Sequence, residues 1–153
     1  MKLRKLYHGS AREIERQYLI PKQPHDLEQD PNNLHFGVYA TSVKEVAIAM
    51  AIISCKGVNW ASLSFRKKPY GLVYAGWPKQ KYLLLYTLPS KTFRKSGGSG
   101  KQYVSVKPVK PLNIERILVK NYINLIRKGT EKEIKKKLKK YGSDFSKKVK
   151  SGH

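Results

Sequence analysis

Leu6-Tyr7-His8-Gly9-Ser10 is the stretch around which the rest of the chain is organised. Residues 2–8 alternate polar and apolar side chains, which predicts a short strand with Leu3 and Tyr7 facing inward. A glycine and a serine break this strand directly after His8. The sequence therefore predicts an imidazole at the end of a strand, where it can reach into a cleft.

A second stretch, Gly37-Val38-Tyr39-Ala40-Thr41, predicts another short strand about thirty residues later. Ser42 and Glu45 follow with the spacing of a capping box, ahead of an apolar run that predicts a buried helix to about Ser54. Gly57 would end that helix. Ser10 and Glu13 have the same capping-box spacing, so a short helix is also expected at residues 11–16.

The remaining elements are expected to be mostly strands. Residues 20–33 hold three prolines among polar residues, a composition typical of a binding loop or lid. One or two strands are predicted within residues 58–79, interrupted by a basic turn at 66–69. Further strands are predicted at residues 81–88, 102–106 and 109–119, and a helical turn at 121–128.

A basic helix is predicted at residues 130–141. Thr130 and Glu133 have capping-box spacing, and Ile134, Leu138 and Tyr141 form one apolar stripe. Together these elements predict an α+β fold: a split or bent antiparallel sheet of about six strands with a few short helices. We expect one domain over residues 1–142 and a flexible tail over residues 143–153.

The charge of the chain is its most unusual property. The 153 residues contain 32 Lys and Arg against 10 Asp and Glu, a net charge of +22. Such a field attracts polyanions, so DNA or RNA is an expected partner. No Asp or Glu occurs between Glu45 and Glu115.

Several classes of site lack the residues that they need. The single cysteine, Cys55, excludes an internal disulfide and a cysteine-based zinc site and predicts a buried thiol. No histidine pair has metal-ligand spacing, so no metal is expected. The run Gly97-Gly98-Ser99-Gly100 is not a P-loop, because no Lys-Ser/Thr pair follows it. Without an apolar leader or a membrane-length apolar run, and with one cysteine, we expect a reducing, cytoplasmic setting. We also expect a monomer.

The two opening stretches, in this order and followed by a strand beginning Gln102-Tyr103-Val104-Ser105, resemble the ADP-ribosyltransferase superfamily. The resemblance is to the His-Tyr-Glu branch, and in size to the small rifampin-modifying ADP-ribosyltransferases. It implies that NAD is the substrate and that the reaction needs no metal cofactor. His8 would bond the ribose next to nicotinamide, the Gly9 backbone would hold the carboxamide, and Tyr39 would stack on the ring. The cofactor-binding residues implied in full are His8, Gly9, Ser10, Tyr39, Thr41 and Ser42.

The sequence departs from that branch at the third position, where Gln102 replaces the expected glutamate. The resemblance implies His8, Tyr39 and Gln102 as the catalytic set. A glutamine accepts a hydrogen bond from a ribose hydroxyl but cannot act as a general base. Three outcomes stay open: transfer to an acceptor that needs less activation, weak NAD hydrolysis, or a pocket that has lost its chemistry.

The acceptor is expected to be nucleic acid or a target associated with it, because of the charge. Basic residues in a glycine-rich loop and on the last helix would contact phosphates: Arg94, Lys95, Lys101, Lys132, Lys136 and Lys139. One alternative is a non-enzymatic nucleic-acid-binding domain in which Trp60, Trp77, Tyr70, Tyr74 and Tyr82 stack on bases. Another is an RNA 2′-phosphotransferase-like enzyme with the same fold.

Overall fold

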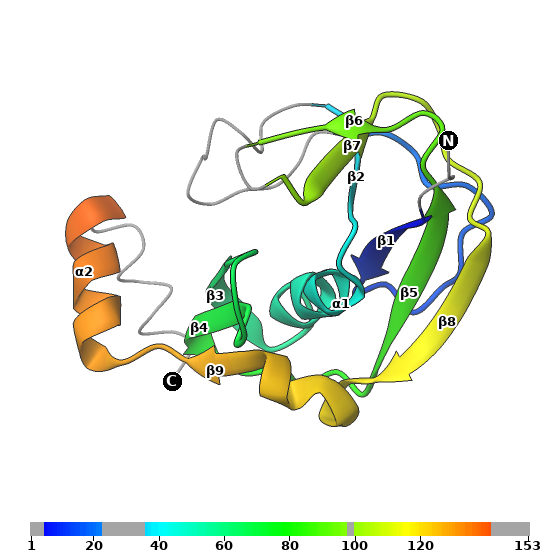
Figure 1. The fold of residues 1–153 in the computed structure, drawn as a ribbon. Helices are drawn as coiled ribbons and strands as arrows, with labels where there is room; N and C mark the ends of the chain where they lie inside the picture. The colour runs from blue at the N-terminus through cyan, green and yellow to red at the C-terminus, as the bar shows by residue number, and fades with distance from the viewer. Residues whose placement is uncertain (1–4, 23–35, 98–99, 142–153) are drawn as a thin grey trace.

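The structure is a computed structural model, and it describes residues 5–22, 36–97 and 100–141 (Figure 1). Its strands form two sheets. The larger has six strands in the order β6-β7-β2-β1-β5-β8, with every neighbouring pair antiparallel. Its strands are β1 (Lys5–Ser10), β2 (Val38–Thr41), β5 (Tyr82–Pro89), β6 (Arg94–Lys95), β7 (Gln102–Ser105) and β8 (Asn113–Leu118). The predicted α+β class with an antiparallel sheet is therefore confirmed.

The smaller sheet has three strands in the order β3-β4-β9. β3 (Val58–Leu63) and β4 (Gly71–Gly76) are antiparallel and flank the basic turn at residues 66–69, as predicted. β9 (Ile126–Lys128) runs parallel to β4 and was not predicted. Residues 121–128 were expected to form a helical turn, but they are divided between the 3-10 helix η2 (Val119–Leu125) and β9.

β5 is the centre of the large sheet, and it is paired along its length with β1 and with β8. Leu83 and Leu85 face the cluster of apolar side chains around α1 (Lys44–Ile53), whereas Leu84 and Tyr86 belong to the cluster on the opposite face. Because both faces are covered, the strand is apolar at nearly every position instead of alternating. Figure 1 shows α1 between the two sheets, as its contacts with both require.

The start of α1 differs from the prediction. Val43 is the N-cap residue and no side chain caps the helix, so the expected capping box of Ser42 and Glu45 is wrong. Thr41 takes over part of this role, since its Oγ1 accepts a hydrogen bond from the Val43 N–H at 3.1 Å. Glu45 instead forms an exposed ion pair with Lys68, at 2.6 Å.

A second predicted capping box, at Ser10, is also wrong. Residues 11–16 are not helical, and Ser10 is the last residue of β1. Its Oγ accepts a hydrogen bond from the Arg12 N–H at 3.2 Å, which forms a turn in place of a helix. β1 continues to Ser10, past the predicted end at His8, and residues 2–4 of the predicted strand lie outside the described residues. Leu6 is fully buried on one face and Tyr7 packs against the α1 cluster on the other, while Leu3 lies outside the described residues.

The last helix is α2 (Glu131–Tyr141), in agreement with the predicted range. Ile134 and Leu138 pack against the cluster of Trp60, Tyr74 and Ala75 on the smaller sheet, as the predicted stripe requires. The expected 109–119 strand is shorter, because Val109 only bridges to Leu19 and β8 starts at Asn113. Most of the predicted loop at 20–33 and the predicted tail lie outside the described residues.

Three further properties follow from the described residues. Cys55 is buried as predicted, and burial raises the pKa of its thiol. Among these residues, no helix is long and apolar enough to cross a membrane. The described part of the chain contains no group of three or more His, Cys, Asp or Glu residues that could hold a metal ion.

Candidate functional site

A cleft opens where β1 and β2 separate. The two strands are paired at one position only, Tyr7 with Thr41. Beyond this pair lies a cleft of about 280 Å³, which we call the His8 cleft. Its lining includes four of the residues expected to bind a cofactor and two arginines that were not predicted: His8, Gly9, Ser10, Tyr39, Arg12 and Arg16.

His8 is held in one orientation at this cleft. Its Nδ1 lies 2.7 Å from the backbone carbonyl oxygen of Tyr39. Since a carbonyl can only accept, Nδ1 carries the proton and donates. Burial lowers the pKa of His8, the hydrogen bond to Tyr39 partly offsets this, and the charge of Lys22 lowers it further. The neutral tautomer therefore dominates near pH 7 and leaves Nε2 as an acceptor.

Residue 9 is a glycine because α1, on the other face of β1, leaves no room for a side chain. A β-carbon at Gly9 would overlap the carbonyl oxygen of Ala47 and lie 2.9 Å from Cβ of Ala51, both in α1. No other residue fits at this position without moving the helix. Gly9 also lines the His8 cleft, so this close approach connects the lining of the cleft to α1.

Three of the predicted site residues lie outside the residues that line this cleft. Thr41 is buried and is the cross-strand partner of both Tyr7 and Gln102. Gln102, in β7, is 8% exposed. Ser42 follows Thr41, and its backbone N–H donates to the carbonyl of Lys101 at 3.3 Å. The register places Tyr7, Thr41 and Gln102 in one row, whereas His8 leaves β1 on the opposite face.

Residues 11–16 form a wall between the His8 cleft and a second cavity of about 570 Å³. We call it the arginine cavity. Its lining includes Arg12, Glu13, Ile14, Arg16, Lys56 and Gln80, of which the two arginines also line the His8 cleft. Residues 11–16 hold two arginines and two glutamates, so their composition gave no signal for this cavity, and a helix was expected there instead.

Hydrogen bonds fix this wall to the large sheet. The side-chain amide of Gln80 donates from Nε2 to the carbonyls of Ala11 and Tyr82, and its Oε1 accepts from the Lys56 N–H at 3.3 Å. At the other end, the hydroxyl of Tyr86 accepts from the Arg16 N–H at 3.1 Å. The wall thus has a defined position although it has no regular secondary structure.

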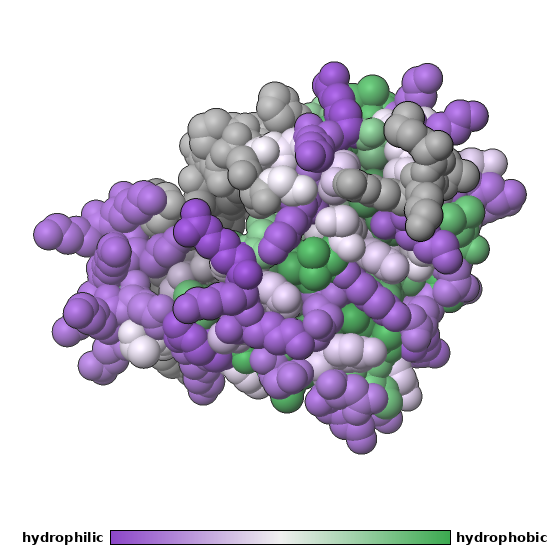
Figure 2. Space-filling model, in the orientation of Figure 1, coloured by the Kyte–Doolittle hydropathy of each residue, from purple (hydrophilic) through white to green (hydrophobic). Residues whose placement is uncertain are grey.

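The residues expected to contact nucleic acid lie on two separate elements and one turn. Arg94 and Lys95 are exposed on β6. Lys132, Lys136 and Lys139 are exposed on α2, on the side away from Ile134 and Leu138. Lys101 is partly buried, and its Nζ donates to the carbonyl of Phe65 at 2.7 Å. Figure 2 shows a strongly hydrophilic surface over the part of the molecule where α2 lies.

The aromatic residues that could stack on bases are mostly engaged elsewhere. Trp60 and Tyr74 are buried beneath α2, with ring centroids 5.0 Å apart. Tyr70 and Trp77 pack against the α1 cluster. Tyr82 is partly buried, and the guanidinium of Arg116 lies 4.2 Å from its ring centroid. These five residues therefore offer little open aromatic surface for stacking.

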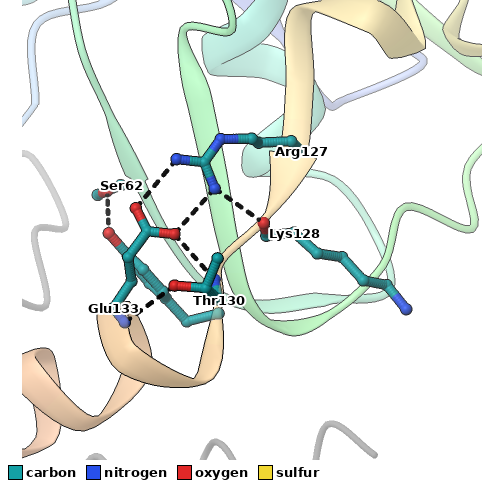
Figure 3. Close-up of polar contacts among 6 residues, drawn as sticks. Ser62, Arg127, Lys128, Thr130 and Glu133 are labelled. Atoms are coloured by element: carbon teal, nitrogen blue, oxygen red, sulfur yellow. Dashed lines mark hydrogen bonds and ion pairs between the residues drawn. The ribbon is translucent and has the colours of Figure 1, made fainter.

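α2 is anchored by one polar cluster (Figure 3). The carboxylate of Glu133 accepts two hydrogen bonds from Arg127, at 2.8 and 3.0 Å, and one from the Thr130 N–H at 2.8 Å. Thr130 Oγ1 in turn accepts from the Glu133 N–H at 3.2 Å, which completes the predicted capping box. The Arg127 bonds, with those of Thr130, lower the pKa of Glu133 to about 2.

Comparisons with known proteins return no match: no family model, no curated protein and no solved structure is matched by this chain. The case for a function therefore rests on the residues of the two clefts.

Proposed function

We propose that this chain binds NAD in the His8 cleft and acts as a mono-ADP-ribosyltransferase-like protein on an acceptor associated with nucleic acid. The observation that carries the proposal is the cleft between β1 and β2, because His8, Gly9, Ser10 and Tyr39 all line it. These residues come from two stretches about thirty positions apart, and the resemblance to ADP-ribosyltransferases rests on the same two stretches.

The state of His8 suits the ribose of NAD. A neutral imidazole that donates from Nδ1 to the Tyr39 carbonyl can accept a hydrogen bond from a ribose hydroxyl at Nε2. A charged imidazolium would have no acceptor and would repel the positive nicotinamide ring. Burial of His8 therefore favours binding of this substrate.

Tyr39 and Gly9 would hold the nicotinamide end. An aromatic face attracts a pyridinium ring, and a glycine backbone allows a planar amide to approach closely. When nicotinamide leaves, its ribose develops oxocarbenium-like charge, so the chain contributes mainly by positioning the reactants. Gln102 lies beside Thr41, on the face opposite His8, and its amide carries no charge, so the proposal gives it no direct part in this cleft.

The setting that we propose is a monomer in a reducing cytoplasm, where a single buried thiol such as Cys55 stays reduced. The exposed lysines of α2 and the residues Arg94 and Lys95 would add sequence-independent attraction for a polyanionic target. This attraction weakens as salt is added.

Calorimetric titration with NAD tests the proposal. Wild type should bind NAD, and His8→Ala and Tyr39→Ala should each weaken binding at least tenfold. Tyr18→Ala is the matched control, because Tyr18 is an exposed tyrosine that does not line either cleft. Turnover is measured in two ways: by the release of nicotinamide, and by the transfer of label from NAD that is labelled in its ADP-ribose part. A folded wild-type protein that neither binds nor consumes NAD would disprove the proposal.

A further inference from the structure

The arginine cavity has the charge of an anion site. Arg12, Arg16 and Lys56 line it, and Glu13 is the one carboxylate among the described lining residues. Its volume of about 570 Å³ lies within the range of small-molecule pockets, roughly 300–1,000 Å³. A nucleotide with its phosphate fits a cavity of this size.

The cationic surface continues beyond the cavity lining. Gln80 lines the cavity, and its side-chain amide donates a hydrogen bond to the carbonyl of Tyr82. Two cationic groups lie over the ring of Tyr82. The Arg116 guanidinium lies 4.2 Å and the Lys81 Nζ 5.4 Å from its centroid. A chain of phosphates leaving the cavity on this side would therefore meet further positive charge.

The arginine cavity also has an apolar contact to offer. Ile14 lines it and is 81% exposed, which is unusual for a large apolar side chain. A base that follows a bound phosphate can pack against this side chain. Cationic groups next to exposed apolar surface suit a single strand better than an inorganic ion.

The two clefts share Arg12 and Arg16 as a wall, so a group bound in one lies next to the other. We propose that the arginine cavity binds the phosphorylated end of a single-stranded nucleic acid and presents that phosphate to the His8 cleft as the acceptor. This inference rests on the proposed function, and it specifies the class of acceptor.

The lining of the His8 cleft, as far as the described residues form it, agrees with a phosphate acceptor. Among the described residues that line the His8 cleft there is no Asp or Glu, and Gln102 cannot remove a proton. A terminal phosphate carries about −1.5 to −2 charges near pH 7, so its oxygen needs no general base. Acceptors with hydroxyl groups would need one.

The step balances without another reactant. A phosphate oxygen forms a bond to C1′ of the nicotinamide ribose as the C–N bond to nicotinamide breaks. The electron pair of that bond stays with the nicotinamide nitrogen, so the positive pyridinium becomes neutral nicotinamide. The phosphate loses one negative charge, and no proton moves.

Binding is tested with a fluorescein-labelled single-stranded ten-nucleotide oligomer that carries a terminal phosphate, followed by fluorescence anisotropy. The cavity variant is R12E/K56E, in which both residues are exposed and use only backbone atoms in the hydrogen bonds described above. The matched control is K91E/K107E, which makes the same change of charge at two exposed residues. Those lie beyond the opposite end of β5, roughly 25 Å away at about 3.3 Å per strand residue.

R12E/K56E should weaken binding at least tenfold at physiological salt, and K91E/K107E less than threefold, because charges that far apart are screened. Equal weakening by the two variants would show diffuse attraction to a basic protein and would overturn the cavity site. NAD titration of His8→Ala reports on the proposed function separately, since that variant leaves the described lining of the arginine cavity intact.

The acceptor is tested with label transfer from NAD to four matched oligomers: RNA and DNA, each with phosphate or hydroxyl ends. Transfer to phosphate ends alone is the expected result, and the RNA and DNA arms then show which strand is preferred. Transfer to hydroxyl ends at the same rate would overturn the phosphate acceptor. If NAD is bound but no oligomer is labelled, the acceptor assignment fails while NAD binding stands.

Discussion

Gly9 in β1 lies directly against the carbonyl of Ala47 in α1, so close that a methyl group on Gly9 would overlap that oxygen. The contact joins the lining of the His8 cleft to the buried helix between the two sheets. The position of the cleft therefore depends on how closely α1 packs on β1.

Gly9→Ala should destabilise the fold strongly, by about 3 kcal/mol, because the obstacle is backbone in a packed helix and cannot rotate away. Gly100→Ala is the control, since Gly100 has a positive φ of 73° but nothing within 4 Å of an added β-carbon. It should cost only about 1 kcal/mol of backbone strain. Urea unfolding measures both, and equal losses would contradict the close packing of β1 on α1.

The partly buried imidazole of His8, whose pKa is lowered by desolvation, predicts a loss of stability in mild acid. Its pKa is below 6.5 in the folded state, so between that lowered value and pH 6.5 the unfolded chain binds more protons. The contribution of His8 is therefore complete above about pH 6.5 and is lost as the pH falls below it. His8→Gln removes the titrating group, and the difference between the two unfolding curves isolates His8. A difference that does not change between pH 7.5 and 5 would contradict a lowered pKa.

Gln80→Ala should loosen the wall that separates the two clefts. The substitution removes the amide that bonds Ala11, Tyr82 and Lys56, and it leaves partly buried backbone groups without those partners. We expect trypsin to cut after Arg12 and Arg16 at least several times faster, with mass spectrometry identifying the sites. Gln17→Ala, at an exposed position in the same region, should leave cleavage unchanged. An unchanged cleavage rate in Gln80→Ala would show that other contacts hold the wall.

Strands and the last helix could be predicted because their signals are local. Alternation and apolar runs identified β5, β7 and the two strands around the basic turn, and the apolar stripe of α2 gave both its range and its buried face. β9 could not be found this way. It is three residues long and exists because it pairs in parallel with β4, a partner far away in the sequence.

The candidate site was predictable in part for the same reason. His8 and Tyr39 belong to short motifs, but the hydrogen bond from the His8 ring uses the backbone of Tyr39, which no side-chain pattern encodes. The two wrong capping boxes show the limit of a spacing rule. Ser10 is kept in β1 by pairing with β5, and Glu45 turns to Lys68, so tertiary contacts decide in both cases.

Glu133 predicts an acid-sensitive attachment of α2. Arg127 and Thr130 hold its pKa at about 2, well below the ordinary 4.5, so the fold favours the charged carboxylate. Its contribution is complete above about pH 4.5 and is lost as the pH falls toward 2. Because its side chain is 32% exposed and screened, we expect about 0.5–1 kcal/mol rather than the full value of the shift.

Glu133→Gln tests this attachment against Glu131→Gln, which removes a charge from the same first turn of α2 at an exposed position. At pH 7, Glu133→Gln should lower the free energy of unfolding, and Glu131→Gln should change it by much less, since Glu133 alone of the two accepts the paired bonds of Arg127. The difference between wild type and Glu133→Gln should shrink as the pH falls from 4.5 to 2 and weaken in high salt. A difference that persists at pH 2 would mean that packing of the side chain, and not its charge, holds α2 on the smaller sheet.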